Sequence, residues 1–385
     1  MKIAVWHNLP SGGGKRALYS FVKELSARGH HIECWTPVTS NQAYLPLDKL
    51  VPVHVVDYKQ PFSFLNKSFP KYLDLFQKSF CIISSLRDIS KQCAEEINRH
   101  NFDVLLSANC RYQAVSPIAR FVKIPSVLYS QEPYRRFYEE NVFSAKPVFR
   151  KGIRSQEEKT NARNFSKILV NSKYSKKRID EIYGVESEVC YLGVDTKFFH
   201  NATDLRENFF IGVGAFQAHK GIDFAIECIS RLPEPRPPLV WVGNLISNDY
   251  LDYLRGLAKS LNVDFQPRIM VSDPDLVSLL ARARLLLYTS HNEPFGLAPL
   301  EAGACETPVV AVAEGGVCET VQNDINGFLV ERNPESAAKR IQQLLADKML
   351  AYQMGKNARK LVEKNWTFHQ SVNRLEKILA EAKSL

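Results

Sequence analysis

Several patterns that would assign this sequence to common protein classes are missing from it. None of its eight cysteines forms a CxxC pair, and its nine histidines include no HxxxH or HExxH spacing. Redox motifs and the usual zinc sites are therefore not indicated, and we expect buried, reduced thiols. No window approaches the roughly 18 consecutive apolar residues of a membrane-spanning helix. The strand-like start MKIAVWHNLP also lacks the apolar run of a signal peptide, so we expect a cytoplasmic protein.

The composition is that of an ordinary globular protein. The 385 residues are 45% hydrophobic and 24% charged, enough to build two or three domains with large cores. Fifty basic and 41 acidic side chains give a net charge of +9, which favours an anionic partner such as a phosphorylated ligand or an acidic lipid. Basic and aromatic residues do not interleave as in nucleic-acid-binding modules, so we expect no nucleic-acid partner.

Short apolar runs alternate with helical patterns along nearly the whole chain, and a polar break near 195–207 divides them into two sets. Continuous apolar strands, each followed by a helix, indicate parallel sheets covered on both faces. We therefore predict an α/β fold of two doubly wound domains in tandem, whose ligands bind at the carboxyl ends of the strands. The predicted strands are 2–7, 31–36, 51–58, 103–108, 126–130, 167–172 and 188–192, then 209–215, 239–243, 263–267, 284–290, 308–313 and 327–331.

The stretch YTSHNEPFGLAPLEAGACETPVVAVAEGGVCETV is the most informative in the sequence. Glu293 and Glu301 are separated by seven residues, and Phe295-Gly296-Leu297 between them indicates the start of a helix just past a strand. The free amides of such a helix start, with a glycine that allows close approach, form a site for an anion. Carboxylates beside it suit the hydroxyls of a sugar or ribose. The pattern predicts a site for a sugar, a diphosphate and a ribose in a row.

This stretch, with the rest of the chain, resembles the family 4 glycosyltransferases of GT-B fold. The signature motif of this family is a Glu followed by seven residues and a second Glu, within an E-x-F-G-L…E-A sequence. The segments PSGGGKRALYSFVKELSARGHHIECWT, ILVNSKYSKKRIDEIYGVESEVCYLGVDTKFF, VGAFQAHKGIDFAIECISRL and EGGVCETVQNDINGFLV match further parts of the family in the same order. The resemblance implies two Rossmann-like domains facing a central cleft, with a C-terminal helix crossing back to the first domain.

The resemblance implies an acceptor-binding domain at 1–195 with 369–385, and a donor-binding domain at 196–368. Glu301 would hold the ribose hydroxyls, and the amides around Phe295, Gly296 and Leu297 would contact the phosphates. In the expected catalytic pair, Glu293 would contact the donor sugar and Lys220 would neutralise the diphosphate leaving group, where charge accumulates in the transition state.

The glycine-rich loop SGGGK allows two interpretations. Gly12-x-Gly14-x-x-Ala17 matches a dinucleotide-binding fingerprint, with Glu33 about twenty residues on. Glu33 falls inside a predicted strand rather than at its end, which argues against NAD. In the resembling family this loop faces the cleft, so Gly13 and Gly14 would approach the donor.

Other residues of the first domain are candidate contacts of the acceptor. They are Lys15, Asn109, Gln131 and Glu132.

Two departures from the family pattern bear on catalysis. Ala215 stands where many members have an Arg, so one cation at the diphosphate is missing. Gln131 stands where many relatives have a His, and Gln can only form hydrogen bonds, which puts general base catalysis by a side chain in doubt. The family is expected to retain anomeric configuration by front-face attack, in which the leaving phosphate takes the acceptor's proton, so no base is required.

Three further segments carry expectations. Asp273-Pro274-Asp275 is a DxD motif, but Ser272 or Asp273 is expected to cap a helix there, so we predict no metal site and no cofactor. The basic and aromatic stretch 58–87 would suit either an anionic membrane surface or a helix packed on the first domain. Val372, Leu375, Ile378 and Leu379 form one apolar stripe for packing on the first domain.

The sequence therefore predicts a retaining glycosyltransferase. It would transfer a hexose from a nucleotide-diphosphate sugar to a hydroxyl of a glycan or lipid-linked acceptor in cell-surface polysaccharide or lipopolysaccharide synthesis, at the inner face of the membrane. The alternatives are another sugar-nucleotide enzyme, such as a 2-epimerase, and a catalytically impaired sugar-nucleotide-binding protein.

Overall fold

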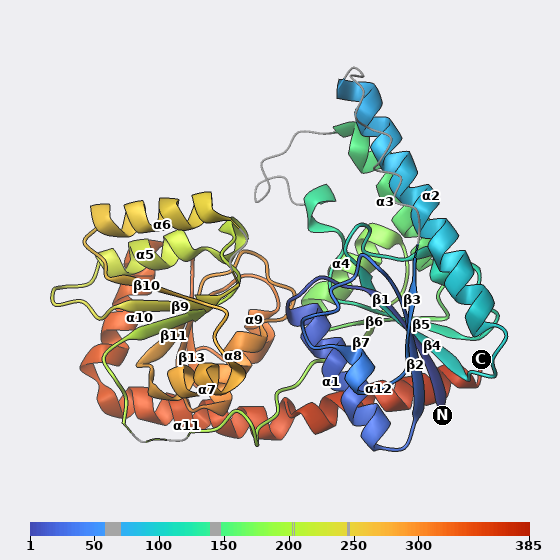
Figure 1. Cartoon of the computed structure of the whole chain (residues 1–385). Coiled ribbons are helices and arrows are strands. Elements are labelled where there is room, and N and C mark those ends of the chain that lie inside the picture. The colour runs from blue at the N-terminus through green and yellow to red at the C-terminus, as the bar shows by residue number, and fades with distance from the viewer. Residues whose placement is uncertain (58–70, 139–147, 202, 204, 245–246) are drawn as a thin grey trace. The chain divides into compact units, whose positions relative to one another are not determined.

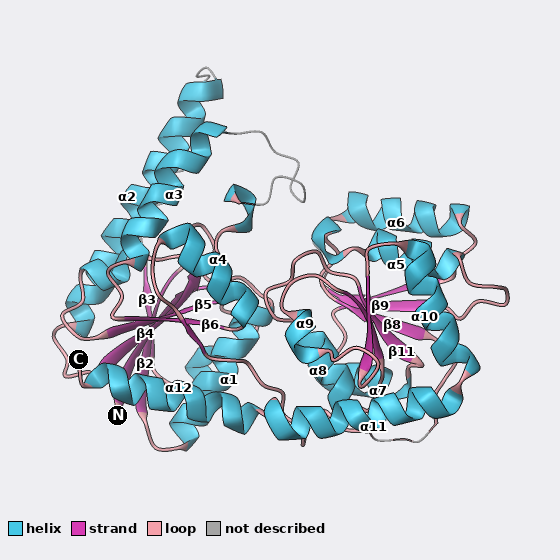
Figure 2. Ribbon diagram, turned by 180° about the vertical axis from the view of Figure 1, so that it is seen from behind, coloured by secondary structure: helices cyan, strands magenta, loops and turns pink. Residues whose placement is uncertain are grey.

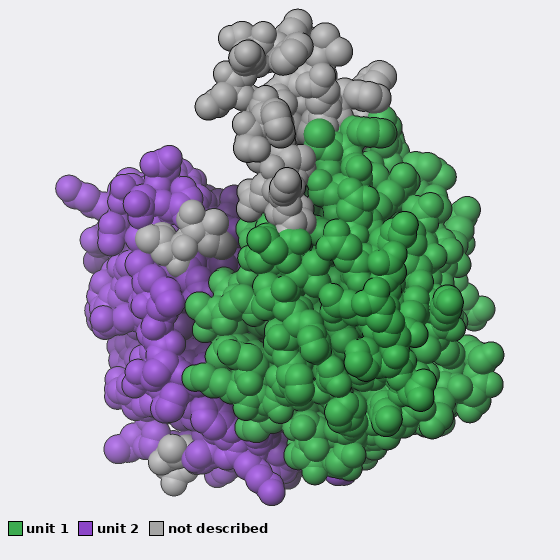
Figure 3. Space-filling model, turned by 45° about the vertical axis from the view of Figure 1, so that its right-hand side comes forward, with its two compact units in different colours: residues 1–191, 372–385 green, residues 192–371 purple. Residues whose placement is uncertain are grey.

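The computed structural model describes residues 1–57, 71–138, 148–201, 203, 205–244 and 247–385 (Figure 1). The chain forms two compact units, Met1–Tyr191 with Val372–Leu385 and Leu192–Ser371 (Figure 3). The sequence had suggested boundaries at 195/196 and 368/369. Residues 58–70 of the basic and aromatic stretch 58–87 lie outside the described residues, and the rest of the stretch belongs to α2 (Lys71–Ile97). Among the helices that are described, none has the length and apolarity needed to cross a bilayer.

The first unit is built on a seven-stranded parallel sheet in the order β3-β2-β1-β4-β5-β6-β7. The connections reverse direction between β1 and β4, which is the switch point where such sheets bind ligands. The strands are β1 (Lys2–Asn8), β2 (His31–Pro37), β3 (Val53–Val56), β4 (Val104–Cys110), β5 (Ser126–Ser130), β6 (Lys167–Val170) and β7 (Glu188–Val189).

Helices cover both faces of this sheet (Figure 2). A core that includes Trp6 and Trp35 packs one face against three helices. The side chain of Tyr129 in β5 contacts Phe21 of α1, with ring centroids 5.4 Å apart. Because Leu128 belongs to the first core and neighbouring strand residues point to opposite faces, α1 covers the second face. The helices are α1 (Gly13–Ala27), α2 (Lys71–Ile97), α3 (Val148–Ala162), α4 (Lys173–Tyr183) and α12 (Phe368–Lys383).

The second unit repeats the plan with a six-stranded parallel sheet in the order β10-β9-β8-β11-β12-β13, whose switch point lies between β8 and β11. Its strands are β8 (Phe210–Val213), β9 (Leu239–Gly243), β10 (Phe265–Ile269), β11 (Leu285–Tyr288), β12 (Val309–Val312) and β13 (Gly327–Val330). Its helices are α5 (Ile222–Ser230), α6 (Asn248–Ser260), α7 (Asp273–Arg282), α8 (Leu297–Ala304), α9 (Val317–Thr320), α10 (Pro334–Ala346) and α11 (Lys348–Asn365).

Two arginines fix the polar segment that follows residue 195 to the second unit. The guanidinium of Arg359 donates to the carbonyls of Thr196 and Phe199 at 3.0 and 2.8 Å. Arg206 donates to the carbonyls of Ala281, near the end of α7, and of Cys305, the C-cap of α8. Cations suit these positions because the last carbonyls of a helix lack partners within it. The segment therefore belongs to the second unit.

The DxD motif lies at the start of α7. The Ser272 hydroxyl caps the helix by accepting from the amide of Asp275, as the sequence predicted. Within the described residues, no group of three His, Cys, Asp or Glu side chains is arranged to hold a metal ion.

Helix α12 returns the chain to the first unit. Val372, Leu375, Ile378 and Leu379 are all buried, as the predicted stripe required. Three ion pairs flank the stripe: Glu376 with Arg28, Glu381 with Lys167, and Lys383 with Asp103, at 2.6, 2.7 and 3.0 Å. The helix is thus an integral part of that unit.

We predict that Leu375→Ala lowers the free energy of unfolding of the first unit by about 2–5 kcal/mol, because it leaves a cavity in a fully buried contact. Lys377→Ala is the matched control, since the Lys377 side chain is 78% exposed on the same helix. Differential scanning calorimetry measures both. Equal transition temperatures for the two variants would show that α12 does not support the unit.

Candidate active site

The turn before α8 is shaped by a glycine, as the sequence predicted. Gly296 has φ of +89°, and a Cβ built on it would lie 2.9 Å from the Tyr288 hydroxyl, so a side chain there would be strained. Gly296 is also the N-cap of α8, and the first turn of the helix contains no acidic residue. No group among the described residues accepts a hydrogen bond from the amides of Gly296 and Leu297. The turn therefore presents free donors and positive partial charge to an anion.

An ion pair joins two loops at the carboxyl edge of the second sheet. Lys220 ends the 3₁₀ turn η5 (Ala218–Lys220) after β8, and its Nζ donates to Oε2 of Glu293, in the loop after β11, at 2.6 Å. The side chains are 17% and 22% exposed. The Thr289 hydroxyl donates to the Lys220 carbonyl at 3.0 Å. The structure thus brings together the two residues predicted to act in catalysis.

The loop after β12 packs on the backbone of Glu293. Gly316 donates its amide to the Glu293 carbonyl at 2.8 Å. Gly315 has φ of +76°, and a Cβ on it would lie 2.3 Å from the same carbonyl. Only glycine fits so close an approach. The sequence motif contained both glycines, but their contact with Glu293 appears only in the fold.

Arg332 anchors the backbone of the loop after β11 by hydrogen bonds. Its guanidinium forms a two-pronged pair with the Glu314 carboxylate, at 2.8 Å for each contact. It also donates to the carbonyls of Thr289 and Ser290 at 3.0 and 3.3 Å. Burial raises the pKa of Glu314, but hydrogen bonds from Arg332 outweigh this and leave that pKa below its ordinary value. No sequence motif indicated Arg332, which follows β13 and acts through contacts distant in the chain.

The remaining predicted donor residues lie in or beside α8. Phe295 is buried directly before the helix, and its ring lies 5.7 Å from that of Trp366. Glu301 lies within α8 and is 8% exposed. Ala215 lies in the loop after β8, in the same loop as Lys220, and brings no charge there. The structure thus clusters the predicted residues on the loops after β8 and β11 and on α8, while the role of each stays a prediction.

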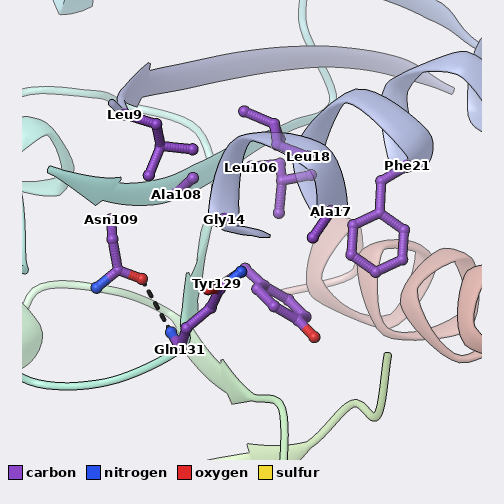
Figure 4. A pocket seen from close by; sticks show the side chains of 10 residues that line it. All are labelled: Leu9, Gly14, Ala17, Leu18, Phe21, Leu106, Ala108, Asn109, Tyr129 and Gln131. Carbon is purple, nitrogen blue, oxygen red and sulfur yellow. Dashed lines mark hydrogen bonds between the residues drawn. The ribbon is translucent and has the colours of Figure 1, made fainter. Parts of the chain in front are cut away.

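In the first unit, Asn109 and Gln131 are linked at the ends of β4 and β5. The Asn109 side chain accepts from the Gln131 amide at 2.9 Å and donates to the Glu132 carbonyl at 3.1 Å. Figure 4 shows the Gln131 side chain beside Gly14, where a Cβ would lie 3.3 Å from Oε1 of Gln131. Glu132 also pairs with Arg135 at 3.6 Å.

A small recess lies beside this pair (Figure 4). Its volume is about 20 Å³, which is room for one water molecule. Its lining is mainly apolar and comprises Leu9, Gly14, Ala17, Leu18, Phe21, Leu106, Ala108, Asn109, Tyr129 and Gln131. Gly13, the first residue of α1, follows Gly12, which has φ of +135°.

Lys15 is not where the sequence suggested. Its side chain is 1% exposed, and Nζ lies 3.2 Å from Nε2 of His7, which is fully buried. Burial lowers the pKa of Lys15 and the pKa of His7. Nδ1 of His7 accepts from the Leu9 amide at 3.3 Å, so Nε2 is the ring nitrogen that faces the Lys15 amine. Lys15 therefore supports the loop from inside the unit and does not face an acceptor.

Glu33 lies inside β2, as expected, rather than at its end. It accepts from His54 of the neighbouring strand β3 at 2.7 Å and from His31 at 3.0 Å. The carboxylate is thus engaged at the sheet.

Two family profiles together match residues 11–361. The one described as "Glycosyltransferase Family 4" matches 11–198, and "Glycosyl transferases group 1" matches 194–361. The chain is 26% identical to N-acetyl-alpha-D-glucosaminyl L-malate synthase of Bacillus anthracis over 96% of this chain and 94% of that protein. It is 28% identical to an uncharacterized glycosyltransferase of Methanocaldococcus jannaschii, covering 57% and 60% of the two chains. It is 36% identical to an alpha-1,3/1,6-mannosyltransferase of Rhizomucor pusillus, covering 29% and 24%. The chain thus spans less than two thirds of the length of the latter two relatives.

Solved structures share the fold over the whole chain. Sucrose-phosphate synthase of Thermosynechococcus elongatus has a TM-score of 0.78 at 17% identity and covers 99% of both chains. HepE of Anabaena, solved with UDP-glucose, has a TM-score of 0.76 at 18% identity and covers 99% of this chain and all of that one. The fold is GT-B. Together with the family profiles, it shows that this chain belongs to the family 4 glycosyltransferases.

Proposed function

We propose that this glycosyltransferase transfers a hexose from a nucleotide-diphosphate sugar to a hydroxyl of a glycan or lipid-linked acceptor, with retention of configuration. The ion pair of Lys220 and Glu293, beside the uncapped start of α8, carries the proposal. One cation, free amides and a carboxylate suit two parts of such a donor, because the diphosphate needs positive charge and the sugar hydroxyls need a hydrogen-bond acceptor. HepE, which shares the fold, was solved with UDP-glucose, in line with this donor class.

The donor residues act in sequence in this proposal. Glu301 accepts hydrogen bonds from the ribose hydroxyls, and the amides of Gly296 and Leu297 donate to the phosphates. Lys220 leaves Glu293 for the diphosphate, and Glu293 then accepts from hydroxyls of the sugar. The anomeric C–O bond breaks towards the β-phosphate while the acceptor oxygen bonds to the same face of that carbon. The acceptor's proton goes to the departing phosphate oxygen.

This route needs no side-chain base, which suits Gln131. The acceptor is held by the first unit in this proposal, near Asn109, Gln131 and Glu132, and Gly13 and Gly14 let backbone approach the ligands. Lys220 and the α8 amides meet the leaving-group charge, so we propose a reaction without a metal ion or other cofactor. Peripheral contact with an anionic membrane belongs to the same proposal and is favoured by the net charge of +9.

The most direct test is a thermal-shift panel of UDP-, GDP-, ADP- and dTDP-sugars. A ligand at 100 times its dissociation constant stabilises a protein by about 2.7 kcal/mol, so one nucleotide class should raise the melting temperature clearly. The responding donor is then incubated with L-malate and D-inositol 3-phosphate, acceptors named for two relatives, and with octyl glucoside. Nucleoside diphosphate release tied to a glycoside product supports transfer. An epimerised donor would indicate a 2-epimerase, and binding without turnover an impaired enzyme.

We predict that Glu301→Ala weakens nucleotide binding by about 10- to 100-fold, because hydrogen bonds to a charged group contribute about 1.5–3 kcal/mol. Isothermal titration calorimetry with the responding nucleoside diphosphate measures it. The control is Glu335→Ala. Glu335 lies on α10 in an exposed ion pair with Arg231, so this variant loses the same charge and should bind the nucleotide normally. Equal affinities of all three proteins would remove Glu301 from the donor site.

We also predict that Lys220→Met lowers kcat by about a hundredfold and changes the donor KM far less, because the charge it meets grows in the transition state. Lys360→Met, at an exposed position of α11, serves as the control. Steady-state kinetics of nucleoside diphosphate release separates the two constants. A change confined to KM would mean that Lys220 only binds the ground state.

A further inference from the structure

Helix α3 of the first unit carries a fully buried carboxylate that the proposed transfer does not use. Glu158 is 0% exposed. One oxygen accepts from the Ala114 amide at 2.8 Å and the other from the Tyr183 hydroxyl at 3.1 Å. The Tyr138 hydroxyl is close enough to lower the pKa of this carboxyl group and forms a hydrogen bond of 2.8 Å with Oγ of Ser155. A buried carboxylate held by two donors is ordered by them and orders them in return.

The surroundings of Glu158 include parts of the two loops that carry the proposed acceptor contacts. Ala114 lies in the loop that follows β4, the strand that contains Asn109, and Tyr138 lies in the loop after β5, which begins with Gln131 and Glu132. The second donor, Tyr183, is the last residue of α4. Glu158 thus ties α3 to the loop after β4 and to α4, and it lies beside Tyr138 of the loop after β5.

Other contacts of α3 reach the same loops. The Gln113 side chain donates to the Arg154 carbonyl at 3.4 Å, and the Asn161 side chain donates to the Val115 carbonyl at 3.1 Å. The Arg154 guanidinium lies over the rings of Tyr134 and Phe137, 5.2 and 4.9 Å from their centroids. Helix α3 therefore supports residues 113–115 and 134–138 with polar and cation–π contacts around Glu158.

We propose that Glu158 is a positioning residue for the acceptor side of the transfer: its ionised carboxylate fixes the loops after β4 and β5, and so sets Asn109 and Gln131. The inference rests on the proposed function in one respect only, namely that these loops bind the acceptor. An ionised carboxylate accepts from Ala114 and Tyr183 together and can also accept from Tyr138, whereas a protonated one must donate through one of its oxygens. Ionisation therefore tightens both loops at once.

The ionisation falls within the working pH range of an enzyme. Burial raises the pKa of Glu158 to about 7, against the lowering effect of hydrogen bonds from Ala114, Tyr183 and Tyr138 and of the charge of Arg154. Glu132 is the other charged group facing this cluster, through Tyr183. Because the pKa is raised on folding, the stability linked to Glu158 is present at low pH and is lost as pH rises through 7. Loop order should change in the opposite direction, rising with pH.

Because stability and loop order are expected to change in opposite directions with pH, the inference can be tested without a ligand. Hydrogen exchange measured by mass spectrometry compares wild type with Glu158→Gln at pH 6 and pH 8, corrected for intrinsic rates. We expect peptides covering 109–116 and 131–138 to exchange about tenfold more slowly at pH 8 than at pH 6 in wild type, since one hydrogen bond of ordinary strength is gained. Glu158→Gln should show no such pH difference, and its melting temperature should fall less than that of wild type between pH 6 and pH 8.

Two variants separate positioning from general support of the fold. Tyr138→Phe keeps the packing but removes one donor, so it should loosen 131–138 and leave 109–116 unchanged. Glu158→Asp keeps the charge and should restore part of the pH difference. In the transfer assay, Glu158→Gln should raise the acceptor KM about tenfold for whichever of L-malate, D-inositol 3-phosphate or octyl glucoside wild type uses, without changing the affinity for the nucleoside diphosphate.

Exchange that is identical in wild type and Glu158→Gln at both pH values would overturn the inference. So would equal loosening of every peptide of the first unit in Glu158→Gln and Tyr138→Phe, because that pattern reports a structural role alone. A wild type that binds no sugar nucleotide would contradict the proposed function while leaving the exchange result to decide on Glu158.

Discussion

The contact between the Lys220 and Glu293 side chains depends on how the backbone of their two loops is positioned. Each residue lies in a loop that follows a parallel strand, and the loops are held by the Thr289 hydroxyl and by close approach of Gly315. A lysine charge that is already paired loses little when a diphosphate replaces the carboxylate, whereas an unpaired buried charge would be costly. The pair keeps the cation in place without a ligand, and in the proposed function it frees a carboxylate when the diphosphate binds.

Parallel sheets explain why so much of this arrangement could be predicted from sequence. All the predicted strands occur, and the turn at Gly296 and the cap at Ser272 follow local rules of glycine conformation and helix starts. The carboxyl ends of neighbouring strands meet at one edge, so residues after β8, β11 and β12 come together although they are far apart in the chain. Local pattern and topology were sufficient to predict that these residues of the second unit come together; that they bind the donor stays a prediction.

Contacts that depend on burial could not be predicted in this way. Lys15 follows a glycine-rich loop and looks exposed in sequence, yet its amine lies under the loop against His7. Arg332 and Glu158 lie in ordinary helical or strand-end settings, and their partners are separated from them by at least 18 residues. Each is a polar group whose role depends on which distant loop packs against it in the fold. The two units therefore share a principle: buried or partly buried ionisable groups beneath the strand ends hold the loops on which the candidate residues lie.

The central claim is that the donor's diphosphate replaces Glu293 as the partner of the Lys220 amine. Isothermal titration calorimetry of the wild-type protein with UMP and UDP, and with GMP and GDP, tests this directly. The second phosphate should strengthen binding at least about tenfold for the base that is recognised, because it adds a charge-assisted contact worth about 1.5–3 kcal/mol. Equal dissociation constants for the monophosphate and the diphosphate would contradict the account.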